Sequence, residues 1–351
     1  MRQLRDAVAA WIAADLRVAG ATLVRSDGST PHQLGLSLVV SGSGDTAGAL
    51  SGGCVDADVV LACDRVLAGG PAEILTFGAT DDDGARLVCG GVITVWVHEL
   101  DLATVSAIAG TTDAVMFTRR HGSDVRHGAV TARLARELER GKSGADPTAT
   151  AAARWLLRSR RRTEMLGDVD GAELFFEAFG RRRLFVVVGS SGYTEALCAQ
   201  AALLGYETVV VEPRPRFAAG IAFADEVIGS WPDVALAKLA QHGRIDDRSA
   251  IVVCTHDPKF DEPALVAALD TPAGFIGAMG SRTTTAERLA RLRGRGIPEP
   301  ALRRIHAPIG LDLGGASPAE TAVSIAAQMI SVTSGRSAAP LRETSGPLHA
   351  R

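Results

Sequence analysis

Few cysteines, few aromatic residues and no long apolar run distinguish this chain of 351 residues. Five cysteines cannot form the dense disulfide framework of a small secreted domain, and their odd number leaves at least one thiol unpaired. Free thiols are typical of the reducing cytoplasm, where we expect the protein to act. No stretch approaches the roughly 18 apolar residues of a membrane helix, and charges interrupt the N-terminal MRQLRDAVAAWIAADL. The sequence therefore predicts neither a membrane span nor a secretory leader.

An excess of one charge sign is also missing. Lys and Arg total 37 against 40 Asp and Glu, a formal net charge of −3. This balance provides no overall attraction to nucleic-acid phosphates or to anionic lipids, so we expect neither partner. The chain does have 46% hydrophobic residues, which is ordinary for a globular protein with full cores.

The hydrophobic pattern changes near residue 182. Before it, helices are predicted at about 2–17, 55–68 and 129–140, with a basic helix in the second half of 141–167. Strands are predicted at 21–24, 36–40, 73–77, 92–97, 114–118 and 173–179. After it, strands at 184–188, 208–212, 250–254 and 274–277 alternate with helices, the last of which begins with a capping box at 317–320. We therefore expect an α/β protein: a mixed α/β N-terminal domain (1–181), a Rossmann-like C-terminal domain with a doubly wound parallel sheet (182–334) and a flexible tail (335–351).

A glycine-rich turn follows the first strand of the C-terminal domain. Gly189-Ser190-Ser191-Gly192 occupies the place of a Rossmann phosphate turn, and Glu212 ends the next strand, as a ribose-binding acid does. Ser191 and Thr194 stand where the fingerprint has its second and third glycines. The pattern is compatible with NAD(P) but supports it weakly; the alternative is a Rossmann scaffold that holds another ligand.

Two cysteines stand beside paired glycines in the N-terminal half. Gly52-Gly53-Cys54 precedes a predicted helix, whose N-terminus favours a thiolate. Cys89-Gly90-Gly91 precedes a strand. A thiolate beside open backbone suits sulfur transfer or a soft metal. Two buried cysteines, or a Cys54–Cys89 disulfide, are the alternatives. The three other cysteines lie on apolar faces and are predicted to belong to the core: Cys63, Cys198 and Cys254.

Polar residues follow three strands of the predicted parallel sheet. Ligands of such sheets lie beyond the carboxyl ends of the strands. There, His256 and Asp257 follow one strand, Gly280, Ser281 and Arg282 the next, and His306 another segment. Ser281 and the N–H groups of the following helix can hold a phosphate, with Arg282 as a bidentate partner. The two histidines can donate to an anion or carry a proton.

Several ordered motifs together resemble the XdhC/CoxI family of accessory proteins for molybdenum hydroxylases. They are DGSTP (27–31), SGGCVD (51–56), CGG (89–91), THDPKFD (255–261), IGAMGSR (276–282) and IHAPIGLDLGGASPAETAVSIAAQMI (305–330). The resemblance implies that the chain binds molybdenum cofactor, protects its sulfurated form and transfers it to a hydroxylase apoenzyme. It also implies a homodimer and a cysteine desulfurase partner. The chain departs from the family pattern at His32, Asp56 and the turn at 189–191.

The leading hypothesis is a cytoplasmic molybdenum-cofactor chaperone for a hydroxylase of the xanthine dehydrogenase or carbon monoxide dehydrogenase type, without turnover of its own. Cys54 is the expected contact to molybdenum or its sulfido ligand. The alternatives are an NAD(P)-dependent oxidoreductase with a redox thiol, and an interaction scaffold that docks through the basic helix. The residues expected to contact the cofactor are Gly52, Gly53, Cys54, Cys89, Gly90, Gly189, Ser190, Ser191, Glu212, His256, Asp257, Gly280, Ser281, Arg282 and His306.

Overall fold

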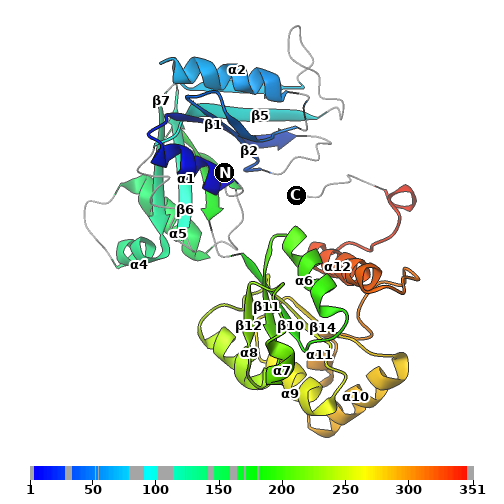
Figure 1. The fold of residues 1–351 in the computed structure, drawn as a ribbon. Helices are drawn as coiled ribbons and strands as arrows, with labels where there is room; N and C mark the ends of the chain where they lie inside the picture. The colour runs from blue at the N-terminus through cyan, green and yellow to red at the C-terminus, as the bar shows by residue number, and fades with distance from the viewer. Residues whose placement is uncertain are drawn as a thin grey trace. The chain divides into compact units, whose positions relative to one another are not determined.

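The computed structural model describes residues 4–27, 34–51, 53, 55–78, 91–101, 114–122, 124–140, 146–158, 164–169, 171–179 and 182–345. The chain divides into two compact units. The first comprises Met1–Arg181 with Ser345–Arg351, and the second comprises Arg182–Thr344. Each unit has its own sheets and its own core, and each is described by itself (Figure 1).

The first unit contains a five-stranded antiparallel sheet in the order β3-β2-β1-β5-β4. Side chains alternate between its two faces along each strand. Leu38 and Val40 of β2 pack in a cluster with α2, whereas Val39 packs in a cluster with α1. Both faces are therefore covered. The elements are α1 (Arg5–Ala13), β1 (Val18–Asp27), β2 (Ser37–Ser41), β3 (Thr46–Gly48), α2 (Asp56–Leu67), β4 (Glu73–Phe77) and β5 (Val92–Glu99).

A second, four-stranded antiparallel sheet of this unit has the order β7-β6-β9-β8. Its strands are β6 (Ala114–His121), β7 (Asp124–Thr131), β8 (Glu164–Val169) and β9 (Ala172–Phe179). The helices α4 (Ala132–Glu139) and α5 (Pro147–Arg158) pack on it around Trp155 and Phe176. The ring of His98 in β5 contacts that of His127 in β7, with centroids 4.0 Å apart and the planes tilted by 32°. Burial holds the pKa of His98 well below its ordinary value and lowers that of His127 to about 4.

The second unit is a six-stranded parallel sheet in the order β12-β11-β10-β13-β14-β15. Counted from β10, this is the 3-2-1-4-5-6 order of a dinucleotide-binding fold. Helices α6 and α12 cover one face around Leu197 and Ile325; α8, α9 and α10 cover the other around Leu236, Leu265 and Leu292. The strands are β10 (Arg183–Val188), β11 (Tyr206–Val211), β12 (Glu226–Ile228), β13 (Ala250–Val253), β14 (Phe275–Ala278) and β15 (Ile305–His306). The helices are α6 (Thr194–Leu203), α7 (Pro215–Ala218), α8 (Pro232–Gln241), α9 (Pro258–Leu269), α10 (Arg282–Gly294), α11 (Glu299–Leu302) and α12 (Pro318–Ser334), followed by the short η2 (Leu341–Glu343).

The predicted fold class is confirmed: one unit has a parallel Rossmann-like sheet and the other is mixed α/β. The capping box at Ser317 and Glu320 is also present. The basic helix was placed wrongly. The helix there is α5, which begins at Pro147 because the carboxylate of Asp146 accepts the N–H groups of Thr148 and Ala149, and the chain is a strand again from Glu164. Most of the Arg158–Arg162 run lies outside the described residues.

The helix predicted at 129–140 begins later, because residues 124–131 form β7. Thr131 caps α4 by accepting the N–H of Leu134. Gly128 in the middle of β7 weakened the strand signal in the sequence. A Cβ at Gly128 would lie 2.2 Å from the Phe117 ring of β6, so the glycine makes room for a cross-strand aromatic side chain.

Candidate functional site at the carboxyl edge of the parallel sheet

The carboxyl ends of β10, β11, β13 and β14 lie at one edge of the parallel sheet, where ligands of doubly wound folds bind. The turn after β10 begins at Gly189, which has φ +101°. A Cβ there would lie 2.5 Å from Thr255 Cγ2, because the residues that follow the neighbouring strand β13 pack against the turn. Gly189 is therefore required both by its backbone conformation and by this close approach.

The β10–α6 turn uses most of its own N–H groups. The N–H of Ser190 donates to Glu212 Oε2 at 2.7 Å, and the N–H of Ser191 donates to Thr194 Oγ1 at 2.9 Å. The N–H of Tyr193 donates to Ser191 Oγ at 3.3 Å. Thr194, fully buried in the place of the third fingerprint glycine, donates its hydroxyl back to Gly189. The hydroxyls of Ser191 and Thr194, which replace glycines, thus accept backbone N–H groups that would otherwise be available to the phosphates of a dinucleotide.

Glu212 is fully buried and is closed to a ribose. Its Oε1 accepts the backbone N–H and the Nε of Arg214, and its Oε2 accepts Ser190 N–H and Arg214 Nη2. Burial alone raises the pKa of Glu212, but the hydrogen bonds from Arg214 and Ser190 outweigh it and lower the pKa below its ordinary value. The predicted ribose acid therefore holds the turn to the β11 end, and both of its oxygens are occupied.

The segment after β13 combines an exposed and a structural side chain. His256 is exposed with φ +59°, an uncommon conformation for a residue other than glycine. Asp257 caps α9 by accepting the N–H of Lys259 at 3.1 Å. Of the two predicted cofactor contacts here, the exposed His256 side chain is accessible to a ligand, while the carboxylate of Asp257 is engaged in capping α9.

The turn after β14 is more open than the turn after β10. Ser281 caps α10 by accepting the N–H of Thr284 at 3.0 Å, and Ser281 and Arg282 are both exposed. Gly280 has φ +151°, and a Cβ at Gly280 would have ordinary contacts at 3.5 Å and beyond. Its glycine is required by conformation and not by crowding. The predicted phosphate residues Gly280, Ser281 and Arg282 are thus brought together at the N-terminus of α10.

A buried arginine of this turn escaped the sequence analysis. Arg288 lies two turns into α10, is 2% exposed, and donates to Asp261 Oδ2 at 2.8 Å and to the carbonyl of Met279 at 3.0 Å. Asp261 in turn accepts the hydroxyl of Thr255. The ion pair therefore links the ends of β13 and β14. Asp261 is the last residue of the THDPKFD motif, but its arginine partner lies outside that motif and the sequence alone did not indicate it.

His306 lies at the end of the edge strand β15. Its ring stacks on Phe275 with centroids 4.8 Å apart and an angle of 7° between the planes. Burial lowers the pKa of His306 below its ordinary value. A neutral, stacked imidazole has a packing role that the sequence could not distinguish from a ligand contact.

The residues that flank the Cys89 motif, at the end of β4 and the start of β5, lie at one end of the antiparallel sheet. Phe77 pairs with Ile93 and Asp27 pairs with Val92, so β1 and β4 end where β5 begins. The helix α2 begins at Asp56, whose carboxylate accepts the N–H groups of residues 50, 51 and 53. Gly53 is exposed, with φ +113°. The other predicted residues of the two cysteine motifs lie outside the described residues: Gly52, Cys54, Cys89 and Gly90.

The remaining cysteines are buried, as predicted for the core. Burial raises the pKa of Cys63 and of Cys198 to about 12, and that of Cys254 to about 11, so none of the three is a thiolate at neutral pH. Within the part of the chain that the structure describes, no group of three His, Cys, Asp or Glu side chains could hold a metal ion.

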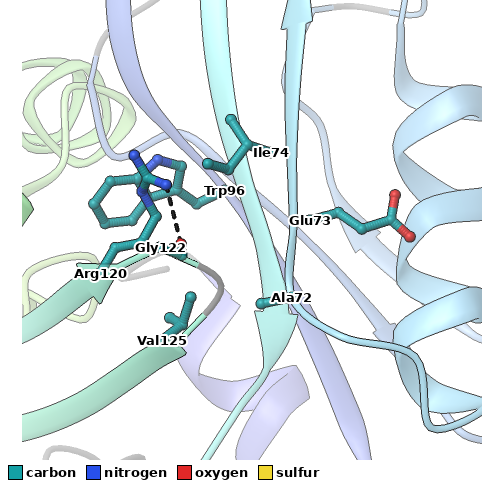
Figure 2. Close-up of a pocket in the computed structure, with 7 residues that line it drawn as sticks. All are labelled: Ala72, Glu73, Ile74, Trp96, Arg120, Gly122 and Val125. Atoms are coloured by element: carbon teal, nitrogen blue, oxygen red, sulfur yellow. Dashed lines mark hydrogen bonds between the residues drawn. The ribbon is translucent and has the colours of Figure 1, made fainter.

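A pocket of about 240 Å³ lies in the first unit, and none of its lining residues is a predicted site residue (Figure 2). Arg120 lies over Trp96, 5.6 Å from the ring centroid, and is paired with Glu173. Glu73 points away from the indole in Figure 2 and is paired with Arg65. The pocket presents mainly apolar surface, and both of its charged side chains are held in ion pairs. Its lining residues are Ala72, Glu73, Ile74, Trp96, Arg120, Gly122 and Val125.

Comparison with known proteins explains this combination of units. Residues 185–329 match the model of the XdhC Rossmann domain, and residues 11–78 match that of the XdhC and CoxI family. The chain belongs to the XdhC/CoxI family. The family resemblance seen in the sequence motifs is thus confirmed, and it extends over both units.

Three curated relatives are 25–27% identical to this XdhC/CoxI chain over the aligned residues. A probable xanthine dehydrogenase subunit of Bacillus subtilis is 26% identical over 88% of this chain and 91% of its own length. The molybdenum cofactor insertion chaperone PaoD of Escherichia coli is 25% identical over 89% of this chain and 82% of its own. The uncharacterized protein YqeB of Escherichia coli is 27% identical over 47% of this chain, which spans only 30% of YqeB.

A crystal structure described as a xanthine dehydrogenase from Bacillus halodurans has the same fold. It is 19% identical, covers 98% of both chains and has a TM-score of 0.68. The described helices of the present chain include none that is long and apolar enough to cross a membrane.

Proposed function

We propose that this protein binds molybdenum cofactor as cargo and delivers it to the apoenzyme of a molybdenum hydroxylase of the xanthine dehydrogenase or carbon monoxide dehydrogenase type. The observation that carries the proposal is the similarity to PaoD, a protein named as a molybdenum cofactor insertion chaperone. The similarity covers 89% of this chain. The open turn at the carboxyl edge of the parallel sheet supports it, since the pterin of the cofactor carries a phosphate. A cysteine desulfurase partner and a homodimer belong to the same proposal.

The phosphate end of the cofactor is assigned to the second unit. Ser281 and Arg282 at the N-terminus of α10 and the exposed His256 are the side chains that lie at the carboxyl edge and are available to a ligand. A helix N-terminus stabilises an anion through its free N–H groups and its partial positive charge. The dinucleotide alternative receives little support from the β10–α6 turn, because Glu212 and Thr194 already accept the N–H groups of Ser190 and Ser191.

Cys54 is proposed as the sulfur contact to molybdenum or its sulfido ligand. Support comes from the neighbouring residues that the structure describes. Asp56 stabilises the loop before α2 by accepting backbone N–H groups on both carboxylate oxygens, and Gly53 is exposed with no atom within 4 Å of where its Cβ would stand. Asp56 thus fixes the described residues 50, 51 and 53, and Gly53 faces open space.

Transfer of the cofactor tests the function as a whole. The full chain is incubated with molybdenum cofactor, freed of excess and mixed with a hydroxylase apoenzyme. We expect bound molybdenum in the protein and hydroxylase activity that depends on it. A chain that retains no molybdenum, or retains it without activating any apoenzyme, contradicts the proposal.

The Cys54→Ala variant tests the sulfur contact separately, with Cys63→Ala as the matched control because Cys63 is fully buried. We expect Cys54→Ala to lose most of the bound molybdenum and Cys63→Ala to retain it. Equal loading of the two variants removes Cys54 from the mechanism.

A further inference from the structure

The turn between β14 and α10 presents backbone donors that have no acceptor in the protein. Within residues 182–345, all of which are described, no hydrogen bond uses the N–H groups of Gly280, Arg282 or Thr283. They open a helix of 13 residues, whose aligned peptide dipoles leave partial positive charge at this end. After β10, Glu212 and Thr194 satisfy the N–H groups of Ser190 and Ser191, while those of Gly192, Glu195 and Ala196 also have no acceptor within this range. What distinguishes the β14–α10 turn is the buried arginine behind it, Arg288, which has a terminal nitrogen without a partner among the described residues.

Arg288 sets the orientation of the open turn. Its Nη2 donates to the carbonyl of Met279 at 3.0 Å, from the interior side. The peptide between Met279 and Gly280 is planar and trans, so a carbonyl directed towards Arg288 turns the N–H of Gly280 the opposite way. Arg288 thereby aims that donor away from the core.

The other terminal nitrogen of Arg288 is buried without a partner. Nη1 is shielded from solvent and has no hydrogen bond to any described residue. The side chain as a whole is only 2% exposed, so water does not replace the missing partner. A buried charged donor without an acceptor is costly. A Cβ placed on Gly280 would lie 3.6 Å from this nitrogen. Gly280 thus puts no side chain between the turn and Nη1, and a ligand oxygen completes the hydrogen bonding of Nη1 when the turn opens to admit it.

We propose that the β14–α10 turn is the phosphate subsite of this protein. It takes a tetrahedral oxyanion, the phosphate of a phosphorylated ligand, on the N–H groups of Gly280, Arg282 and Thr283, with the buried Arg288 as a charged donor and positioning residue. Asp261 keeps the charge of Arg288 balanced when the subsite is empty. The identification of this phosphate with that of the pterin rests on the proposed function; the oxyanion subsite itself does not.

Calorimetric titration of the full chain with inorganic phosphate tests the subsite. Arg282→Pro removes one N–H and the guanidinium, and the first helical position accommodates proline. Ser281 already has the extended backbone that a residue before proline requires, with φ −69° and ψ 167°. Arg282→Ala is the matched control, because it removes the guanidinium alone. Ser191→Ala is the control in the other turn.

We expect saturable phosphate binding. Arg282→Pro should weaken the affinity about tenfold more than Arg282→Ala does, because it also removes one charge-assisted hydrogen bond from the backbone N–H. Ser191→Ala should leave the affinity within about twofold. No saturable binding at millimolar phosphate, equal affinity of the Pro and Ala variants, or a loss in Ser191→Ala instead overturns the inference.

The double variant Arg288→Met with Asp261→Asn tests Arg288 without leaving a buried charge unpaired. We expect cooperative thermal unfolding close to that of the wild type and phosphate affinity about tenfold lower. A folded double variant that keeps full affinity excludes Arg288 from the subsite.

Molybdenum retention separates this inference from the proposed function. One outcome is that the wild type binds phosphate but retains no molybdenum cofactor, and that Arg282→Pro loses the phosphate binding. This outcome upholds the subsite and overturns the chaperone proposal. Cofactor and phosphate retained equally by Arg282→Pro and Arg282→Ala overturn the subsite and leave the chaperone proposal standing.

Discussion

The second unit has two glycine turns at the same edge of its sheet, one after β10 and one after β14. The first has the sequence of a degraded Rossmann fingerprint, and its side-chain hydroxyls and Glu212 bond to its own backbone. The second has no fingerprint, yet its N–H groups are open and a buried arginine lies behind it. The topology of a nucleotide-binding fold is therefore kept here, while the anion site that we propose lies at another strand end than the fingerprint.

The largest expected effect is at the buried ion pair of the second turn. Arg288→Ala leaves Asp261 as an uncompensated buried charge, so we expect the free energy of unfolding to fall by about 3–5 kcal/mol. Denaturant unfolding measures it, with Arg291→Ala as a control, because Arg291 pairs with Glu262 but is itself exposed. A loss of less than about 1 kcal/mol shows that the pair is not the anchor of this turn.

Acid should weaken the first unit while leaving both turns intact, since neither turn contains a histidine. His127 has a folded pKa of about 4 against about 6.5 when unfolded, so the unfolded chain binds the proton more tightly. The stabilisation is complete above pH 6.5 and is lost as the pH falls towards 4, by up to about 3 kcal/mol.

Hydrogen exchange at pH 7 and pH 5 checks this, with His127→Phe as the variant that cannot be protonated. The wild type should lose protection in β5 and β7 at the lower pH, and the variant should lose less. Equal loss in both proteins, or loss centred on the two turns, contradicts the assignment.

Alanine at the two turn glycines should separate stability from binding. Gly189→Ala forces a methyl group against Thr255, so we expect a loss of about 3 kcal/mol in stability. The methyl group of Gly280→Ala has room, so the strained φ alone should lower the stability, by about 1 kcal/mol. The methyl group stands, however, where the proposed oxyanion enters, so phosphate affinity should fall. Thermal unfolding and phosphate titration of both variants test this, and the reverse pattern would falsify the distinction.

The smallest expected effect is that of nicotinamide nucleotides on the first turn. Because Arg214 occupies both oxygens of Glu212, NAD(P)H should show no saturable binding at micromolar concentration. Fluorescence titration checks this. Saturable binding that Glu212→Gln abolishes would restore the oxidoreductase alternative.

The sequence was sufficient for the parallel sheet, because continuous apolar strands alternate with helices there. It was also sufficient for the three core cysteines and for the capping box of α12. It could not show that Thr194 closes the glycine turn, since this depends on a hydroxyl that bonds back to Gly189. Arg288 and Asp261 were beyond reach for a similar reason: they stand 27 residues apart and meet only when β13 and β14 pair.

The most direct test of the account is an amide chemical-shift titration of the isotopically labelled full chain with inorganic phosphate. We predict saturable shifts of the Gly280, Arg282 and Thr283 N–H resonances, with those of Ser190 and Ser191 unchanged. Shifts at Ser190 and Ser191, with the β14–α10 turn silent, would contradict the claim that the anion site lies at another strand end than the fingerprint.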